Sequence, residues 1–147
     1  MKGKILFTSK NDADCINLDE YDIKLQIVRY INKGLKKDFI HVAQLSPSEE
    51  LFSRTMYKWK KLIFTQKEKD YMFNKGLTHS WWDLYEYKFN KEMDEEVAFI
   101  KAYNRLKEHL DNGKSIIAIC YCEDFRKCHR RLIAERLIKE GYEVILR

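Results

Sequence analysis

The chain has 147 residues, of which 45% are hydrophobic and 35% charged, and its formal net charge is +5. This size and composition fit one folded domain over residues 1–147, with a real hydrophobic core and without the signature of disorder. No apolar run approaches the roughly 20 residues of a membrane span, and no signal-peptide pattern is present. We therefore expect no membrane partner, a cytoplasmic location, and cysteines that are thiols or metal ligands rather than disulfides.

The first third of the chain contains predicted strands separated by polar turns. Apolar or alternating runs predict these strands over residues 4–8, 23–28 and 39–45. Arg29 follows the second run, where its side chain can reach a ligand or simply lie on the surface. Cys15 falls near the first turn, and we interpret it as an inert thiol.

The middle of the chain is predicted to be helical. Ser46 can cap a helix in which Pro47 occupies the first turn and Glu49 lies three residues after the cap, and this helix is expected to reach about Lys61. A second helical segment covers residues 66–74.

An aromatic segment and a long amphipathic helix follow. The segment from Thr78 to Phe89 is dense in aromatic residues, which indicates core or, over residues 81–89, the face of a homodimer. Base stacking is the alternative. Asp94 opens the amphipathic helix, and Asn112-Gly113 closes it.

The last third of the chain carries the strongest pattern. Residues 116–119 are apolar on both faces, which predicts a buried central strand. A helix begins near residues 125–128, Gly141 ends it, and residues 143–146 form another strand. This βαβ unit predicts a three-layer α/β/α domain with a mainly parallel, Rossmann-like sheet of about five strands.

Three cysteines lie where ligands of such sheets bind, beyond the carboxyl end of a strand. Cys128 opens the helix, so we expect a lowered thiol pKa and a role as nucleophile, with His129 as base or proton donor. Cys120 is a further catalytic candidate, although its apolar strand raises its pKa. The acidic neighbours of Cys122 are expected to raise its pKa as well.

The start of this helix is also a candidate anion site. Unpaired backbone N–H groups, together with Arg130, would hold a phosphate or a carboxylate. We expect His129 and Arg130 to be exposed, and to matter for ligand binding rather than for folding. An Arg130→Ala variant is then expected to melt near the wild-type temperature.

The cluster has three other interpretations. The cysteines and His129 are crowded within ten residues, which disfavours structural zinc, so no metal or cofactor is expected. Cys120 and Arg126 have the spacing of a tyrosine-phosphatase loop, but the residues between them include two acids and no glycine. Simple packing of buried cysteines is the third interpretation.

The same residues carry a family resemblance. The sequence Cys120-Tyr121, followed by the run from Cys128-His129-Arg130 to Glu135, resembles the family called domain of unknown function 488. Its hallmark is an apolar strand ending in Cys, a short loop, and Cys-His-Arg at the start of a helix. Weaker likenesses cover the segments 5–9, 25–29 and 45–48.

The resemblance implies ligand-binding roles for particular residues and leaves the activity open. The implied ligand-binding residues are Thr8, Ser9, Arg29, Tyr121 and Arg130. Cys122 departs from the family pattern, since many members have Glu there.

Two classes of function stay open. One is a small enzyme that acts on an anionic substrate, a nucleotide or a compound derived from nucleic acid. The other is a non-catalytic module that binds a nucleotide, nucleic acid or a protein. The sequence has no Gly-x-Ser-x-Gly, no His-Glu-x-x-His and no glycine-rich phosphate loop, which disfavours serine hydrolases, zinc hydrolases and P-loop ATPases.

Overall fold

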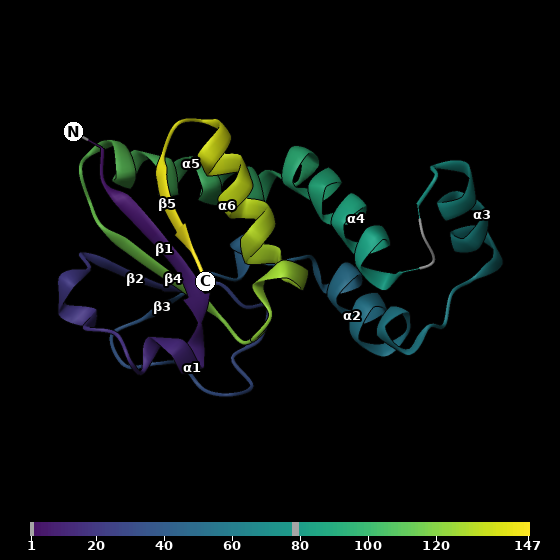
Figure 1. The fold of residues 1–147 in the computed structure, drawn as a ribbon, viewed down its shortest axis with the longest axis horizontal. Coiled ribbons are helices and arrows are strands. Elements are labelled where there is room, and N and C mark those ends of the chain that lie inside the picture. The colour runs from purple at the N-terminus through teal and green to yellow at the C-terminus, as the bar shows by residue number, and fades with distance from the viewer. Residues whose placement is uncertain (1, 78–79) are drawn as a thin grey trace.

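The computed structural model describes residues 2–77 and 80–147 and contains a five-stranded parallel sheet with the order β3-β2-β4-β1-β5 (Figure 1). The strands are β1 (Lys4–Ser9), β2 (Ile23–Gln26), β3 (Ile40–His41), β4 (Ile116–Cys120) and β5 (Glu143–Leu146). The predicted mainly parallel α/β fold is therefore confirmed. β3 is shorter than the predicted 39–45 because a 3₁₀ turn follows at Ala43–Leu45.

β4 is the central strand, as predicted. It pairs with β1 on one side and with β2 on the other, and all five of its residues are buried. Its side chains alternate between two hydrophobic cores: Ile116 and Ala118 lie in the larger one, and Ile117 and Ile119 in the smaller one. Burial on both faces explains why the strand has no polar position.

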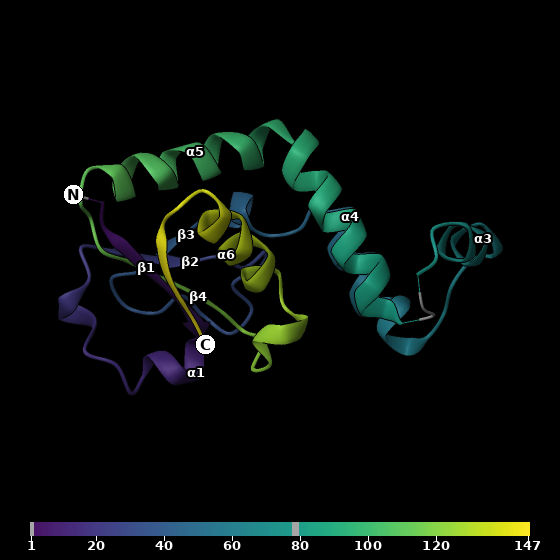
Figure 2. The same cartoon turned by 45° about the horizontal axis from the view of Figure 1, so that its top comes forward.

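Helices cover the two faces of the sheet unequally. The larger core contains residues of α2, α4, α5 and α6, whereas α1 and the neighbouring loops cover the smaller core (Figure 2). The covering layer on the second face is therefore one helical turn with its adjoining loops. The helices are α1 (Lys10–Ala13), α2 (Glu49–Tyr57), α3 (Gln66–Asn74), α4 (Trp81–Glu95), α5 (Val97–Asp111) and α6 (His129–Lys139).

Three predicted helix boundaries are wrong. α2 ends at Tyr57 rather than near Lys61, because a separate 3₁₀ turn covers Trp59–Lys61. Ser48, not Ser46, caps α2: the Ser48 hydroxyl accepts from the Leu51 N–H, while the Ser46 hydroxyl donates to the Ala43 carbonyl. The long amphipathic helix begins at Val97 rather than at Asp94, because the preceding helix α4 extends to Glu95.

The aromatic segment packs mainly inside the chain. Trp82, Tyr85 and Phe89 of α4 are buried in the larger core. This agrees with the core interpretation, and a homodimer through residues 81–89 stays a prediction. Thr78, where the predicted segment begins, lies outside the described residues.

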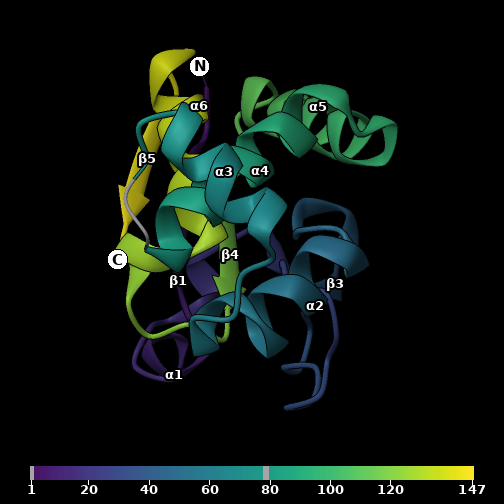
Figure 3. The ribbon, with the colours of Figure 1, turned by 90° about the vertical axis from the view of Figure 1, so that its right-hand side faces the viewer.

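α3 lies at the end of the molecule farthest from the sheet (Figures 1 and 2). Viewed from that end, it stands in front of α4, with α2 below it (Figure 3). In the described part of the chain, no helix is both long and apolar enough to cross a bilayer.

Candidate functional site

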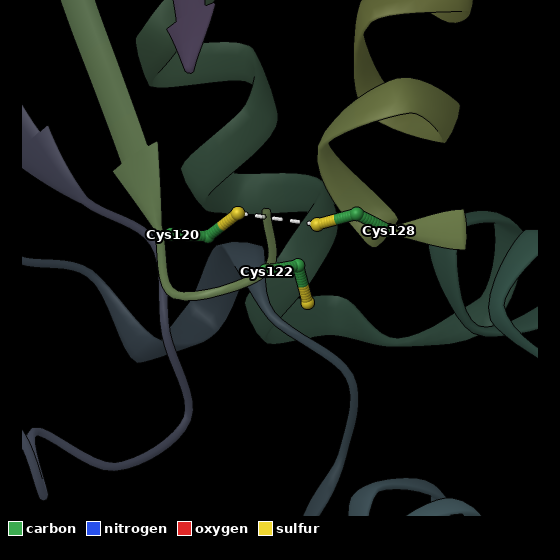
Figure 4. Close-up of side chains that lie close together, drawn as sticks. All are labelled: Cys120, Cys122 and Cys128. Carbon is green, nitrogen blue, oxygen red and sulfur yellow. Dashed lines mark hydrogen bonds between the residues drawn. The ribbon is translucent and has the colours of Figure 1, made fainter. Parts of the chain in front are cut away.

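Three thiols meet where β4 passes into α6. Cys120 is the last residue of β4, Cys128 is the N-cap residue of α6, and Cys122 lies in the loop between them. Their sulfur atoms all lie within 4.8 Å of one another, and the Sγ atoms of Cys120 and Cys128 are 3.1 Å apart (Figure 4). The βα connection itself thus brings together three residues that are spread over nine positions of the sequence.

Arg130 lies behind the thiols and is completely buried. Its Nη1 donates to Cys120 Sγ at 2.8 Å and to the Cys122 carbonyl at 2.6 Å, and its Nε donates to the Arg147 carbonyl at 3.0 Å. The guanidinium therefore joins the end of β4, the cysteine loop and the residue after β5. The expectation of an exposed Arg130 is wrong, because the short βα loop folds over the first turn of α6.

His129 is buried as well, which also contradicts the expected exposure. Its Nε2 lies 2.6 Å from the Ile27 carbonyl, and its Nδ1 lies 3.7 Å from Cys128 Sγ. A carbonyl only accepts, so Nε2 carries the proton and Nδ1 is left as an acceptor facing the thiol. Burial lowers the pKa of His129, which keeps the ring neutral at pH 7.

The thiols divide into two protonated members and one acidic member. Burial raises the pKa of Cys128 well above the ordinary range and that of Cys120 to about 12. Interactions with the Cys120 and Cys128 thiols lower the pKa of Cys122. The interactions within the cluster thus favour the thiolate form at Cys122, which is also the one partly exposed thiol of the three.

The predicted order of acidity is therefore wrong for two cysteines. Cys128 was expected to be acidic at the start of a helix, but only 2% of it is exposed, and desolvation outweighs the charges around it. Cys122 was expected to be made less acidic by its neighbours. The carboxylate of Asp124 is instead turned to Arg126, with an O–N distance of 3.0 Å, and Glu123 accepts a hydrogen bond from Asn11.

Cys122 lines a cavity of about 100 Å³, and so do Cys128 and His129. Cys122 is partly exposed, whereas Cys120 and Cys128 are buried. The remaining wall combines aromatic rings and positive charges. It includes Arg29, Tyr30, Lys60, Trp81, Tyr121 and Lys127.

Two ligand-binding candidates from the sequence, Arg29 and Tyr121, lie in this wall. Arg29 Nε donates to the Pro47 carbonyl at 2.8 Å, which places it between β2 and the start of α2. The Tyr121 hydroxyl accepts from the buried Gln26 amide at 3.1 Å. Both side chains are thus held in place at the edge of the cavity.

Thr8 and Ser9, the other pair expected at the site, do not line this cavity. The Thr8 hydroxyl donates to Asp12 at 2.5 Å, and the Ser9 hydroxyl accepts from the Asp12 N–H at 3.1 Å. They therefore hold the first turn of α1 in the structure, and a ligand-binding role for them stays a prediction.

Positive charge is already present inside the thiol cluster. Arg130 Nη1 lies 2.8 Å from Cys120 Sγ and 3.5 Å from Cys128 Sγ. A guanidinium so close to two of the three sulfurs opposes binding of a second cation, although the thiols are near enough to share one. The structure also disfavours a phosphatase-type loop between Cys120 and Arg126. The Arg126 side chain is 75% exposed and forms an ion pair with Asp124.

Comparison with known proteins gives the family. A model described as the active DUF488-N3 subclade (DUF488-N3a) matches residues 12–141. The chain belongs to the DUF488 family. No curated protein and no solved structure matched the chain in the same comparisons.

Sequence reasoning missed several residues that this DUF488 chain brings to its cavity. Cys122 was discounted because of its acidic neighbours, although its position two residues beyond Cys120 signalled a place in the cluster. Lys60 and Trp81 come from segments far away in the sequence. No local sequence pattern could have placed Lys60 and Trp81 beside the cysteines.

Proposed function

We propose that the protein is an enzyme acting on a nucleotide or nucleic-acid-derived anion, with Cys122 as its nucleophile. The observation that carries the proposal is a cluster of three thiols beside a cavity, in which Cys122 is partly exposed and lines that cavity. The thiolate is the reactive form of cysteine, and Cys122 is the member of the cluster whose pKa is lowered. The matched subclade is itself described as active, which supports the same conclusion.

The other thiols and His129 supply the surroundings that a nucleophile needs. Cys120 and Cys128 stay protonated and can donate to the Cys122 thiolate. His129 Nδ1 is an unprotonated acceptor 3.7 Å from Cys128 Sγ, so a proton leaving the cluster has a neighbouring base. Arg130 adds a fixed positive charge on the buried side.

The wall of the cavity favours a flat, anionic ligand. Tyr30, Trp81 and Tyr121 offer aromatic surface, while Lys60 and Lys127 offer positive charge. The volume of about 100 Å³ is well below the roughly 300–1,000 Å³ of cavities that enclose a drug-sized ligand. A single ring system can therefore enter, and the phosphate-bearing part of the ligand stays at the rim.

Differential alkylation tests the proposed nucleophile. We expect a limiting amount of iodoacetamide at pH 6.5 to label Cys122 at least about tenfold faster than Cys15, which is exposed and lies outside the cluster. The ratio should fall as the pH rises toward 9, because an ordinary thiol ionises near pH 8.5. Peptide mass spectrometry measures the two rates in one sample.

One variant and one ligand sharpen this test. Replacing Cys128 by Ala removes an interaction that stabilises the Cys122 thiolate, so labelling of Cys122 at pH 6.5 should slow, while that of Cys15 should not. Adenosine monophosphate should protect Cys122 selectively. Equal rates for Cys122 and Cys15 at pH 6.5 would exclude a nucleophilic Cys122. If the nucleotide still binds in that case, the non-catalytic binding module becomes the better proposal.

We also propose that the protein works in a reducing compartment such as the cytoplasm. The four cysteines are free, which is the form that such a compartment maintains and that a nucleophilic thiol requires.

A further inference from the structure

One segment of the chain has a strong local excess of positive charge. Residues 54–75 contain seven Lys and Arg and two Asp and Glu, a local net charge of +5. The remaining residues contain 21 of each sign, although residues 24–37 also include five Lys and Arg and no acid. A local excess of this size can form a surface that attracts a polyanion. We call residues 54–75 the basic arm.

The lysines of the basic arm are exposed and are not neutralised. Arg54 pairs with Glu68 at 3.4 Å, but among the described residues none of the six lysines of the arm forms an ion pair. The other six ion pairs of the described chain all lie outside the arm. The exposed lysines of the arm are Lys58, Lys60, Lys61, Lys67, Lys69 and Lys75.

Large apolar side chains lie exposed between these lysines. Phe73 is 80% exposed, Leu62 68% and Tyr57 62%. On α3 the residues one turn before Phe73 are Lys69 and Asp70, so the ring projects from a polar face. An amphipathic membrane-binding helix would instead gather its apolar residues on one face. The rings of Tyr57 and Phe73 therefore lie among exposed lysines, an arrangement that suits single-stranded nucleic acid, whose bases stack on aromatic rings and whose phosphates attract cations.

The basic arm reaches the cavity that contains Cys122. Lys60, in the 3₁₀ turn Trp59–Lys61 that follows α2, lines this cavity, and its Nζ lies 4.9 Å from the centre of the Trp81 ring. Lys127, at the end of the 3₁₀ turn Phe125–Lys127 that precedes α6, also lines it. A polyanion on the arm would thus have part of its length at the mouth of a cavity that admits one ring system.

We propose that the basic arm binds the sugar-phosphate backbone of single-stranded nucleic acid and that one base of this strand enters the Cys122 cavity. The arm itself is inferred from its charge and exposure alone. Only the placement of a base at Cys122 rests on the proposed function. The proposal narrows the substrate class from nucleotide-type anions to nucleotides within a strand.

A binding titration with a matched control tests the arm. We compare the intact protein with a Lys58→Gln/Lys61→Gln/Lys69→Gln variant and with a Lys101→Gln/Lys114→Gln/Lys139→Gln variant, whose three lysines are exposed outside the arm. The probes are fluorescein-labelled DNA and RNA single strands of about 12 nucleotides. Fluorescence anisotropy between about 50 and 200 mM salt gives the affinity and its salt dependence.

The arm variant should bind the strand about tenfold more weakly at low salt, and the slope of log affinity against log salt should fall by about 2. The control variant has the same net charge and should bind like the intact protein. Equal losses in both variants, or no binding by the intact protein, would overturn the proposal. So would binding to phosphatidylserine vesicles without binding to the strand. The probe that binds more tightly shows whether the protein prefers DNA or RNA.

The alkylation and binding experiments keep the two proposals separate, because alkylation reports on Cys122 and the lysine variants report on the arm. If alkylation shows an unreactive Cys122 while the arm variant still loses binding, the arm proposal holds and the enzymatic one fails. If Cys122 is reactive but the arm variant binds normally, the enzymatic proposal holds and the arm proposal fails.

Discussion

Arg130 shows how the environment of a residue decides its role. It stands at the start of a helix among charged neighbours, a position where an arginine is normally solvated. In the fold it is completely buried, and it donates to Cys120 Sγ and to carbonyl groups of the loop and of the C-terminal segment. Such a side chain links three parts of the chain through hydrogen bonds inside the fold, so we expect it to contribute to the stability of the fold.

Replacing Arg130 by Met should therefore destabilise the protein strongly. The change removes the donor to Cys120 Sγ and to part-buried carbonyl groups, and we expect the free energy of unfolding to fall by about 3 kcal/mol or more. Urea unfolding followed by circular dichroism measures the loss. The control is Arg126→Met, whose exposed side chain should contribute less than about 0.5 kcal/mol. If the Arg130 variant unfolds at the wild-type midpoint, the guanidinium is not needed for the fold.

α3 shows how an element with little tertiary support is maintained. It lies far from the sheet, and Met72 is its one buried residue. Its start carries a full capping box, in which the Thr65 hydroxyl accepts from the Glu68 N–H and the Glu68 carboxylate accepts from the Thr65 N–H. Local hydrogen bonds thus add to the packing of Met72 and Tyr71 against the larger core, and together they position the lysines on α3.

A Thr65→Ala variant should loosen α3 without affecting the rest of the fold. Losing the cap costs about 1 kcal/mol, which corresponds to about fivefold faster amide hydrogen exchange within α3. Exchange at β4 and the global unfolding midpoint should not change. A Gln66→Ala variant, on the same exposed turn but outside the capping box, should exchange like the wild type. Slow, unchanged exchange in α3 of the Thr65 variant would mean that packing, not the cap, maintains this helix.

At the scale of the whole molecule, the stability of the fold depends on keeping one buried histidine neutral. His129 connects α6 to the end of β2 through the Ile27 carbonyl and packs edge-on against Phe89 of α4. Burial lowers its pKa in the folded state. The unfolded chain therefore binds a proton at higher pH than the folded chain does.

This difference in proton binding predicts that acid destabilises the protein. As the pH falls below the unfolded pKa of about 6.5, we expect the free energy of unfolding to decrease by up to about 1.4 kcal/mol for each pH unit, until the folded ring is protonated too. Denaturant midpoints between pH 7.5 and 5 measure the slope. In a His129→Gln variant this part of the slope should disappear. If the free energy of unfolding changes with pH equally in wild type and variant, protonation of carboxylates rather than of His129 causes the acid sensitivity.

The sequence by itself determined the parallel α/β fold, the central position of β4 and the location of the thiol cluster. Each depends on local information: an apolar strand, a helix start, or cysteines on either side of one short loop. The tertiary structure alone decided that Cys122 rather than Cys128 is the acidic thiol and that Arg130 is buried. It also decided that Lys60 and Trp81 share a cavity with the cysteines. The physical reason is that desolvation and hydrogen bonding depend on neighbours from the whole chain, which a sequence pattern does not specify.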